Sequence, residues 1–352
     1  MRHFSFYCIL LLCLAAPETA YFQDAGKVES PQAPTDFFED PEPLELFITA
    51  SIKSLKRETN DSTYLEGTLG FRQGAEDPDS ISLRLRARGD FRRTQCYFAP
   101  LKLKFRKSDI RGTLFEGHQE LKLVLPCQIG ALSDDYVLKE YLAYKLFEVV
   151  SPYHYKTRLA EVDFAEVKGR RERTHQLRGF LIEDHGTLAR RLEGKRIRRN
   201  MPPQMQDPYY SVVNNLFEYG IGNTDFSLRI QHNQRLYYID GKYFSIPYDF
   251  DMAGLVNAPY ATVSNAQTIK KPIYQVTDRG YKGYMRDTAL VQQVRQDFLR
   301  ARPEMKRQLE LLEPLFKEDR QYREASAYLE SFFDILADDR KFEREILGYM
   351  RE

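Results

Sequence analysis

Three oxygen-bearing side chains occur close together in the second half of this 352-residue chain, in a pattern that suits a metal ion and a phosphate. Asp225 and Asn233 lie in the segment GNTDFSLRIQHN, and Asp249 follows in IPYDFDMAG, with Asp251 two residues later. Carboxylate and amide oxygens are the ligands that Mg²⁺ and Mn²⁺ prefer in proteins. Asn233, Asp249 and Asp251 are therefore candidate metal ligands. The alternatives are that Asp225 and Asn233 only cap turns, and that Asp251 caps a turn or a helix.

Phosphoryl transfer also needs a cation on the phosphates, a carboxylate that orients this cation, and a base beside the acceptor. Lys122 lies within a predicted strand and Glu140 on the predicted helix that follows, so the two side chains could pair. Asp225 is then the candidate base. Lys102 and Lys104 lie on a comparable strand, so the sequence leaves open which lysine contacts phosphate. A surface ion pair is the alternative interpretation of Lys122 and Glu140.

The elements that would position these residues begin with a strand-rich half. Polar and apolar residues alternate in SISLRLRARG, PLKLKF and ELKLVL, which predicts three strands of an antiparallel sheet with a basic side. Helical spacing predicts one helix from about Asp134 to Val149, capped by Ser133 or Asp134. TRLAEVDFAEV and QLRGFLIED predict a further strand pair.

The second half of the sequence is mainly helical in pattern. GTLARRLEGKRIRRN is basic and predicted to be helical, and a helix is expected to begin near Pro208. RLYYID and KYFSIPYD flank Gly241 and predict a hairpin, and helical spacing resumes from about Asp287. We therefore predict an α+β chain with a strand-rich lobe over 44–184 and a helical lobe over 185–352.

Residues 1–20 have the layout of a secretory signal peptide. Arg2 is followed by an apolar run from Phe4 to Ala16 and then by small residues up to Ala20. This run is too short to span a bilayer as a normal membrane helix, although an uncleaved signal would still act as an anchor. Residues 21–43 are rich in Asp, Glu, Pro and Ala, which predicts a flexible stem. The expected location is the periplasm, the cell envelope or the extracellular space.

Cys96 and Cys127 would remain after cleavage of the signal, in a chain that reaches an oxidising compartment. Cys96 precedes the strand PLKLKF and Cys127 ends the strand ELKLVL, so the two sulfurs could meet if these strands are neighbours. The sequence therefore predicts a disulfide, and two buried thiols are the alternative.

The segments GNTDFSLRIQHN and IPYDFDMAG resemble the signature of the CotH kinases, atypical kinases named for a spore-coat protein. RLRARGDFRR and PLKLKF are also similar to the opening motif of that family, so the resemblance covers roughly 80–261. It implies a two-lobed, protein-kinase-like fold in a secreted member of Gram-negative type. It implies that Asp225 is the catalytic-loop Asp, Asn233 a metal ligand and Asp249 the metal-binding Asp. GFLIEDH, which contains Glu183, would link the lobes and turn backbone groups toward adenine.

The chain departs from the kinase pattern in two places. It has no Gly-rich phosphate loop, since RARGDFRR offers only Gly89, and DFD replaces DFG, so Asp251 adds a carboxylate. The resemblance implies ATP or another nucleotide, with Mg²⁺ or Mn²⁺, as cofactors.

Two function classes follow from these patterns. The first is an exported enzyme that transfers a phosphoryl or nucleotidyl group to a protein or envelope acceptor. The second is a catalytically silent kinase fold that serves as a binding or structural protein of the envelope. Retention of three oxygen donors favours the enzyme. The formal net charge of +1 gives no composition-based reason to expect nucleic acid as the partner.

Overall fold

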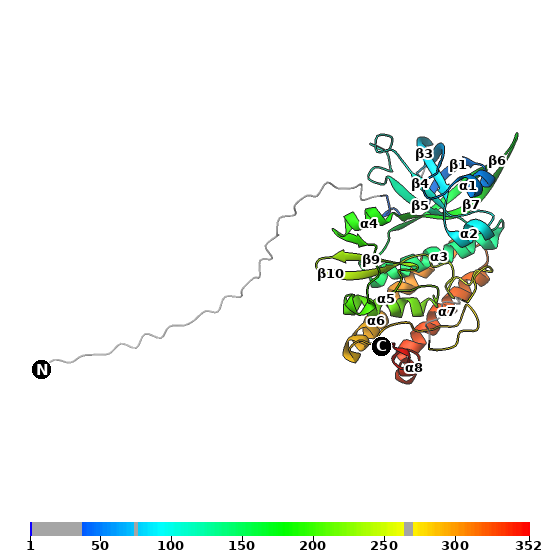
Figure 1. The fold of residues 1–352 in the computed structure, drawn as a ribbon. Helices are drawn as coiled ribbons and strands as arrows, with labels where there is room; N and C mark the ends of the chain where they lie inside the picture. The colour runs from blue at the N-terminus through cyan, green and yellow to red at the C-terminus, as the bar shows by residue number, and fades with distance from the viewer. Residues whose placement is uncertain (2–36, 74–76, 264–269) are drawn as a thin grey trace. The chain divides into compact units, whose positions relative to one another are not determined.

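The computed structural model describes Met1 and residues 37–73, 77–263 and 270–352. The described residues from Phe37 onward belong to one compact unit (Figure 1). The predicted signal peptide after Met1, and the predicted stem as far as residue 36, lie outside the described residues. Within the described residues, no helix is both long enough and apolar enough to cross a membrane.

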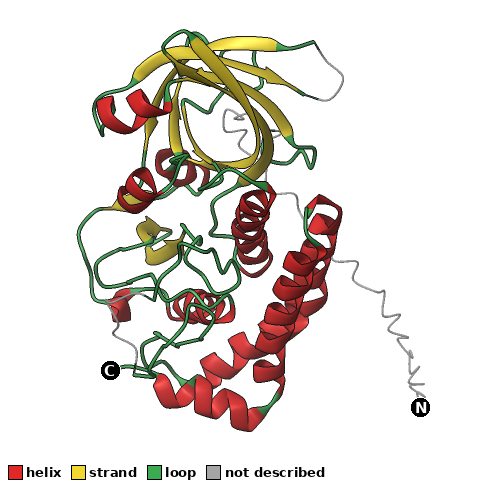
Figure 2. Cartoon of the chain, turned by 90° about the vertical axis from the view of Figure 1, so that its right-hand side faces the viewer, coloured by secondary structure: helices red, strands yellow, loops and turns green. Residues whose placement is uncertain are grey.

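Seven strands form a closed barrel, which is drawn in yellow at the top of Figure 2. The order round the barrel is β1-β2-β3-β4-β5-β7-β6, and β6 pairs again with β1. Neighbouring strands are antiparallel except β1 and β6, which run parallel. The strands are β1 (Leu44–Ala50), β2 (Leu65–Arg72), β3 (Asp79–Ala87), β4 (Leu101–Lys104), β5 (Glu120–Val124), β6 (Thr157–Lys168) and β7 (Arg171–Glu183).

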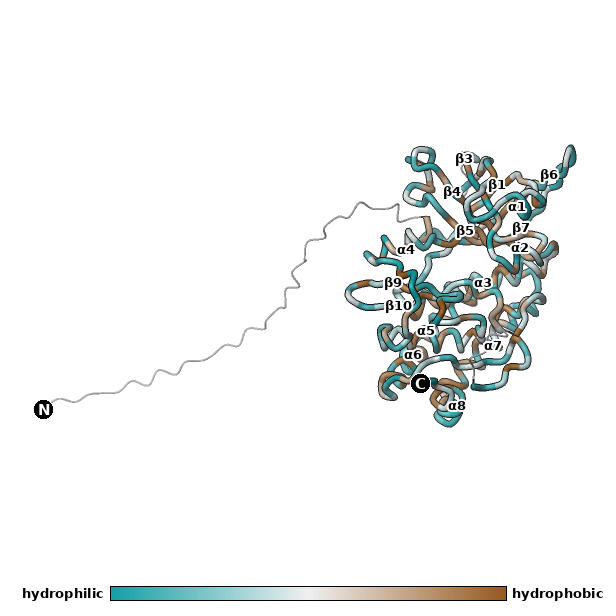
Figure 3. The backbone as a smooth tube through the Cα atoms, in the orientation of Figure 1, coloured by the Kyte–Doolittle hydropathy of each residue, from teal (hydrophilic) through white to brown (hydrophobic). Residues whose placement is uncertain are grey.

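The predicted two-lobed, protein-kinase-like fold with an antiparallel sheet is wrong, because the strands form a closed barrel that includes the parallel pair of β1 and β6. The alternating pattern correctly indicated which side chains of β3, β4 and β5 share the apolar face of the sheet. Leu83, Leu103 and Leu121 are all buried in the barrel core. In Figure 3, apolar and polar residues alternate along these strands. Alternation does not tell which strands meet, however. Closure depends on β1, whose parallel partner β6 is far away in the sequence and is not announced by any turn.

A second sheet of three strands lies beside the helical half. Its order is β10-β9-β8, so β8 stands at one edge. The predicted hairpin is confirmed, and Asp240 and Gly241 form its turn with φ of 45° and 76°. The predicted basic helix after residue 185 is only partly correct, because it ends at Arg191 and the chain then forms β8. The strands are β8 (Lys195–Ile197), β9 (Gln234–Ile239) and β10 (Lys242–Pro247).

The helices confirm most of the helical predictions. The N-cap of α3 is Gly130, whereas Asp134, one of the two predicted caps, accepts a hydrogen bond from the Arg178 N–H. Pro208 opens α5 behind an Asp207 cap, and Asp287 caps α6. The α-helices are α1 (Ile52–Glu58), α2 (Asp90–Gln95), α3 (Ala131–Val150), α4 (His185–Arg191), α5 (Pro208–Gly220), α6 (Thr288–Leu312), α7 (Asp319–Ala337) and α8 (Asp339–Glu345).

Two apolar cores meet at β7. Leu181 faces the barrel core, whereas Phe180 and Ile182 belong to a second core that includes α3, α5, α6 and α7. Lys122 of β5 is the register partner of Ile182. Since neighbouring register partners project to the same face of a sheet, Lys122 points out of the barrel toward the helical half.

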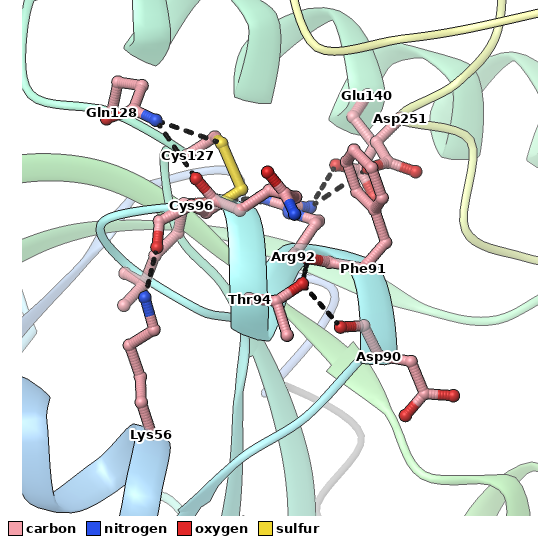
Figure 4. The surroundings of a disulfide bond; sticks show 12 residues. Lys56, Asp90, Phe91, Arg92, Thr94, Cys96, Cys127, Gln128, Glu140 and Asp251 are labelled. Atoms are coloured by element: carbon pink, nitrogen blue, oxygen red, sulfur yellow. Dashed lines mark hydrogen bonds and ion pairs between the residues drawn. A yellow bond between two sulfur atoms is a disulfide. The ribbon is translucent and has the colours of Figure 1, made fainter.

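A disulfide joins Cys96 to Cys127, as the sequence predicts. It ties the end of α2 to the chain just after β5, and Figure 4 shows its surroundings. The disulfide agrees with an oxidising compartment, and export remains a proposal.

Removing this disulfide should destabilise the protein. The two cysteines are 31 residues apart, so the chain-entropy model assigns the bond roughly 3 kcal/mol of unfolding free energy. Urea unfolding of the oxidised chain and of a Cys96→Ser, Cys127→Ser double variant measures this difference. A reducing agent should lower the stability of the parent chain and leave that of the double variant unchanged. Equal stability of the two chains would contradict a structural role.

Candidate functional site

The structure brings Asp225, Asn233 and Asp249 together where the β9–β10 hairpin starts and ends. The Asn233 amide Nδ2 donates to the Asp225 backbone oxygen at 2.7 Å and to Asp225 Oδ2 at 3.1 Å. The Asn233 backbone oxygen accepts a 3.1 Å hydrogen bond from the N–H of Tyr248, the residue before Asp249. The predicted hairpin therefore returns the chain to the loop that carries Asp225.

The Asp225 carboxylate is held by its neighbours and still reaches solvent. Its backbone N–H donates to Asn223 Oδ1 at 2.9 Å, and its Oδ1 lies 3.2 Å from His232 Nε2. Its side chain keeps 26% of its surface exposed. The hydrogen bond to Asp225 raises the pKa of His232, although partial burial opposes this. A carboxylate that is fixed in place and accessible can accept a proton from an incoming group.

Two of the candidate metal ligands have left-handed backbones. Asn233 has φ of 50° and Asp249 has φ of 67°. Asn and Asp adopt this region more readily than other side chains that have a Cβ. The N–H of Asp249 donates to the Tyr144 hydroxyl at 2.9 Å, which fixes Asp249 against α3. Unusual backbone conformations held by surrounding contacts are typical of ligand sites.

A buried polar network under the loop fixes its position. Glu218 of α5 is completely buried, and its two oxygens accept hydrogen bonds from Asn223 Nδ2 at 2.9 Å and from Gln234 Nε2 at 2.6 Å. Asn223 in turn holds the Asp225 N–H. The residues at both ends of the loop are thus joined through one carboxyl group.

Lys282 holds the same loop from the other side. Its buried ammonium donates to the backbone oxygens of Thr224 and Phe226, the neighbours of Asp225. Burial lowers the pKa of Lys282 to about 8, and the nearby Asp225 carboxylate partly opposes this shift. Glu218 and Lys282 could not be singled out from the sequence, because a charged residue in a helix or a coil segment carries no local sign that it is buried.

Glu218 should make the stability of the protein depend on pH. Burial raises the pKa of Glu218 from 4.5 to about 8, so in this window the folded chain keeps a proton that the unfolded chain releases. The free energy of unfolding should therefore fall as pH rises from about 4.5 to about 8. Glu218→Gln, which stays neutral, should reduce this slope in urea unfolding measured across the window. The exposed Glu310 on α6 provides a control, because Glu310→Gln should keep the slope of the parent. A slope that persists in Glu218→Gln would assign the effect to another group.

Lys122 and Glu140 do not form the predicted pair. Lys122 Nζ lies 3.1 Å from His185 Nε2, and it stands over the rings of Tyr155 and Tyr248 at 5.1 and 5.2 Å. Lys122 is buried, and its burial together with the charge of Arg88 holds its pKa well below the usual range. An anion that entered this position would restore the charged form of Lys122.

Lys102 and Lys104, the other candidate phosphate contacts, are neutralised within the barrel wall. Lys102 Nζ lies 2.6 Å from Glu120 and 3.4 Å from Asp184, and Lys104 Nζ lies 3.0 Å from Glu120. Lys122 forms no ion pair with a described residue, which makes it the best placed of the three to bind phosphate.

Glu140 instead pairs with Arg92 of α2, a residue that the sequence analysis did not single out. Arg92 Nη1 lies 3.3 Å from Glu140 and 3.8 Å from Asp251, and all three side chains are buried beside the disulfide (Figure 4). Burial and the charge of Asp249 raise the pKa of Asp251 to about 6, although Arg92 opposes this. One sequence signal could have pointed to Arg92. It lies in an arginine-rich segment just before Cys96, and the predicted disulfide of Cys96 fixes the end of α2.

The resemblance implies that backbone groups of the segment from Gly179 to His185 face adenine, and the structure describes where this segment lies. Its first part, up to Glu183, belongs to β7, which pairs with β5 on one edge and with β6 on the other. The backbone groups of Phe180–Ile182 are therefore engaged in the barrel, whereas Asp184 and His185 begin α4. The Glu183 carboxylate accepts hydrogen bonds from Arg191 at 2.8 and 3.0 Å, so its visible role is to fasten α4 to the barrel.

The residues present fit a divalent cation only in part. Within the described residues, no three His, Cys, Asp or Glu side chains are close enough to form a metal centre by themselves. Asp249 and the Asn233 amide oxygen are hard donors on adjoining segments, and no hydrogen bond within the described residues occupies the side-chain oxygens of either group. Asp251 fits less well, because Arg92 approaches it. Nucleotide phosphates would have to complete such a coordination shell.

Comparisons with known proteins assign no family. No known family model matches the chain, and none of the curated proteins matches it significantly. The resemblance to the CotH kinases therefore depends on the short motifs alone.

Proposed function

We propose that the protein is an exported, metal-dependent phosphotransferase of the CotH-like type, which moves a phosphoryl group from ATP or another nucleotide to a hydroxyl of a protein or envelope acceptor. The observation that carries this proposal is a chain of hydrogen bonds. Asn233 bonds to Asp225 through its side chain and to Tyr248, the residue before Asp249, through its backbone oxygen. The proposal concerns the site and its motifs, and it does not depend on the predicted kinase-like sheet.

The roles of the side chains follow from their surroundings. Asp225 accepts the proton of the acceptor hydroxyl, and the hydrogen bonds from Asn233 and His232 hold its two oxygens in place. Lys122 binds phosphate oxygens from the barrel side. Asp249 and Asn233 would hold Mg²⁺ or Mn²⁺, which neutralises negative charge on the phosphates.

One observation favours the second candidate, a silent binding or structural protein of the envelope. The guanidinium of Arg92 lies between Glu140 and Asp251, where it supplies positive charge to the carboxylates without any metal. A chain that had lost catalysis could keep its buried carboxylates in this way.

A thermal-shift experiment separates the two candidates. The enzyme should be stabilised by ATP, ADP or another nucleotide only when Mg²⁺ or Mn²⁺ is present, because binding to the folded state raises the melting temperature. Lys122→Ala should weaken this shift, and Lys102→Ala, which removes a paired lysine on the neighbouring strand, should not. No shift with any nucleotide and metal would contradict the phosphotransferase and favour the silent protein.

A further inference from the structure

An exposed group of unpaired cations lies next to the loop that carries Asp225. Between Glu193 and Asp207 the chain contains no acidic residue, and its cations are exposed. Arg229, within the loop itself, is also exposed. Within the described residues, none of these cations forms an ion pair or a side-chain hydrogen bond. This basic surface consists of Lys195, Arg196, Arg198, Arg199 and Arg229.

The basic surface is joined directly to the candidate base. Ile197 of β8 is the register partner of Leu236 in β9, so the segment that follows β8 runs beside the start of β9. At its end, the Arg199 backbone oxygen accepts a 2.8 Å hydrogen bond from Gln231 Nε2. Gln231 precedes His232, which contacts Asp225. A chain that followed β8 would therefore arrive at the Asp225 carboxylate.

A hollow of about 340 Å³ opens beside this path. Its lining includes Met201, Pro202, Tyr284 and Arg229, and the acidic Glu352 also faces it. The hollow therefore offers apolar surface for a side chain and a cation for a carboxylate. Arg229 connects the hollow to the loop that carries Asp225.

From this arrangement we propose that the basic surface binds the acceptor as an extended acidic polypeptide, which pairs with the free edge of β8 and presents a hydroxyl to Asp225. This inference names the acceptor, so it rests on the proposed phosphotransferase. Cations that lack partners attract carboxylates and steer them to the site.

One feature favours a polypeptide over other polyanions. Within the described residues, β8 pairs with β9 alone, and an open strand edge can add a peptide strand through backbone hydrogen bonds. A nucleic acid or a lipid surface cannot use these groups in the same way. Basic residues also protect edge strands from aggregation, which would explain Lys195 and Arg196. Protection of the strand edge would not explain Arg198, Arg199 and Arg229, because these residues lie outside β8.

Binding of labelled probes to the full chain tests the proposal. The probes are a short fluorescein-labelled peptide of Asp, Glu and Gly around one Ser, the same peptide with Gln and Asn in place of the acids, a single-stranded oligonucleotide, and vesicles of anionic phospholipid. The acidic peptide should bind best, and high salt should weaken it. Reversing two cations with Arg198→Glu and Arg199→Glu should weaken it by about tenfold or more.

The control variant carries Arg170→Glu and Arg171→Glu. These arginines are also exposed and unpaired within the described residues, but they lie at the β6–β7 turn, far from β8 in the fold (Figure 1). This control should change binding by less than about twofold. Thermal melting checks that each variant is folded, and the milder Arg198→Gln should give a smaller loss in the same direction.

Three outcomes would overturn the proposal. The acidic peptide could bind no better than the neutral one, the control could lose as much as the test variant, or the oligonucleotide or the vesicles could bind more tightly through the same arginines. Asp225→Asn should still bind the acidic peptide. Peptide binding is therefore measured apart from turnover, and a protein that binds the peptide but fails the nucleotide test would contradict only the proposed function.

Discussion

Asp225→Asn should leave nucleotide binding nearly unchanged and reduce turnover by about 10²–10⁴-fold, the usual cost of losing a general base. The carboxamide keeps the shape of the side chain, so Asn223 can still fix the backbone and Asn233 can still contact the loop. It cannot accept a proton, however. Binding is measured by thermal shift with nucleotide and metal, and turnover by transfer of labelled phosphate to the acceptor.

Asp240→Asn is the matched control for this substitution. Asp240 lies at the β9–β10 turn, where its backbone is left-handed, and it is exposed at the far end of the hairpin from Asp225. Its replacement should change neither binding nor turnover. Equal turnover of Asp225→Asn and the parent would remove Asp225 from the chemistry. Loss of nucleotide binding in Asp225→Asn would instead show that this carboxylate helps to bind the metal.

The local part of the site could be predicted from the sequence, because it depends on short segments. The β9–β10 hairpin brings Asn233 and Asp249 together through a turn at Gly241 that the sequence announces. The disulfide could also be predicted, since Cys96 and Cys127 flank strands that turned out to be neighbours. In both cases the contact follows from adjacent elements and a known strand direction.

The remaining parts of the site depend on contacts between distant segments. Alternation in β5 correctly placed Lys122 outside the barrel core, but it could not show that His185 and two tyrosines surround it. Glu140 was assigned to the wrong cation, because its true partner Arg92 lies on a short helix before the disulfide. Barrel closure by β1 and β6 was missed for the same reason, since parallel pairing leaves no turn signal.

Asp249→Asn should have the largest effect on nucleotide binding. Asp249 is the candidate carboxylate ligand that forms no ion pair with an arginine among the described residues, whereas Asp251 lies 3.8 Å from Arg92. Replacing a charged hard donor by a neutral amide should weaken metal binding by more than about 100-fold, beyond the usual effect of changing residues that only orient ligands. The stabilisation by nucleotide with Mg²⁺ or Mn²⁺ should then disappear in the thermal-shift experiment.

Asp251→Asn distinguishes this role from a general loss of negative charge. Asp251 lies 3.8 Å from Arg92, and Arg92 keeps Glu140 as a partner at 3.3 Å when Asp251 is neutralised. Asp251→Asn should therefore keep the metal-dependent shift. If both variants lose the shift equally, the two carboxylates act together as ligands and Arg92 must move aside when the metal binds. If both variants keep it, the metal lies elsewhere and the proposed coordination by Asp249 and Asn233 is incorrect.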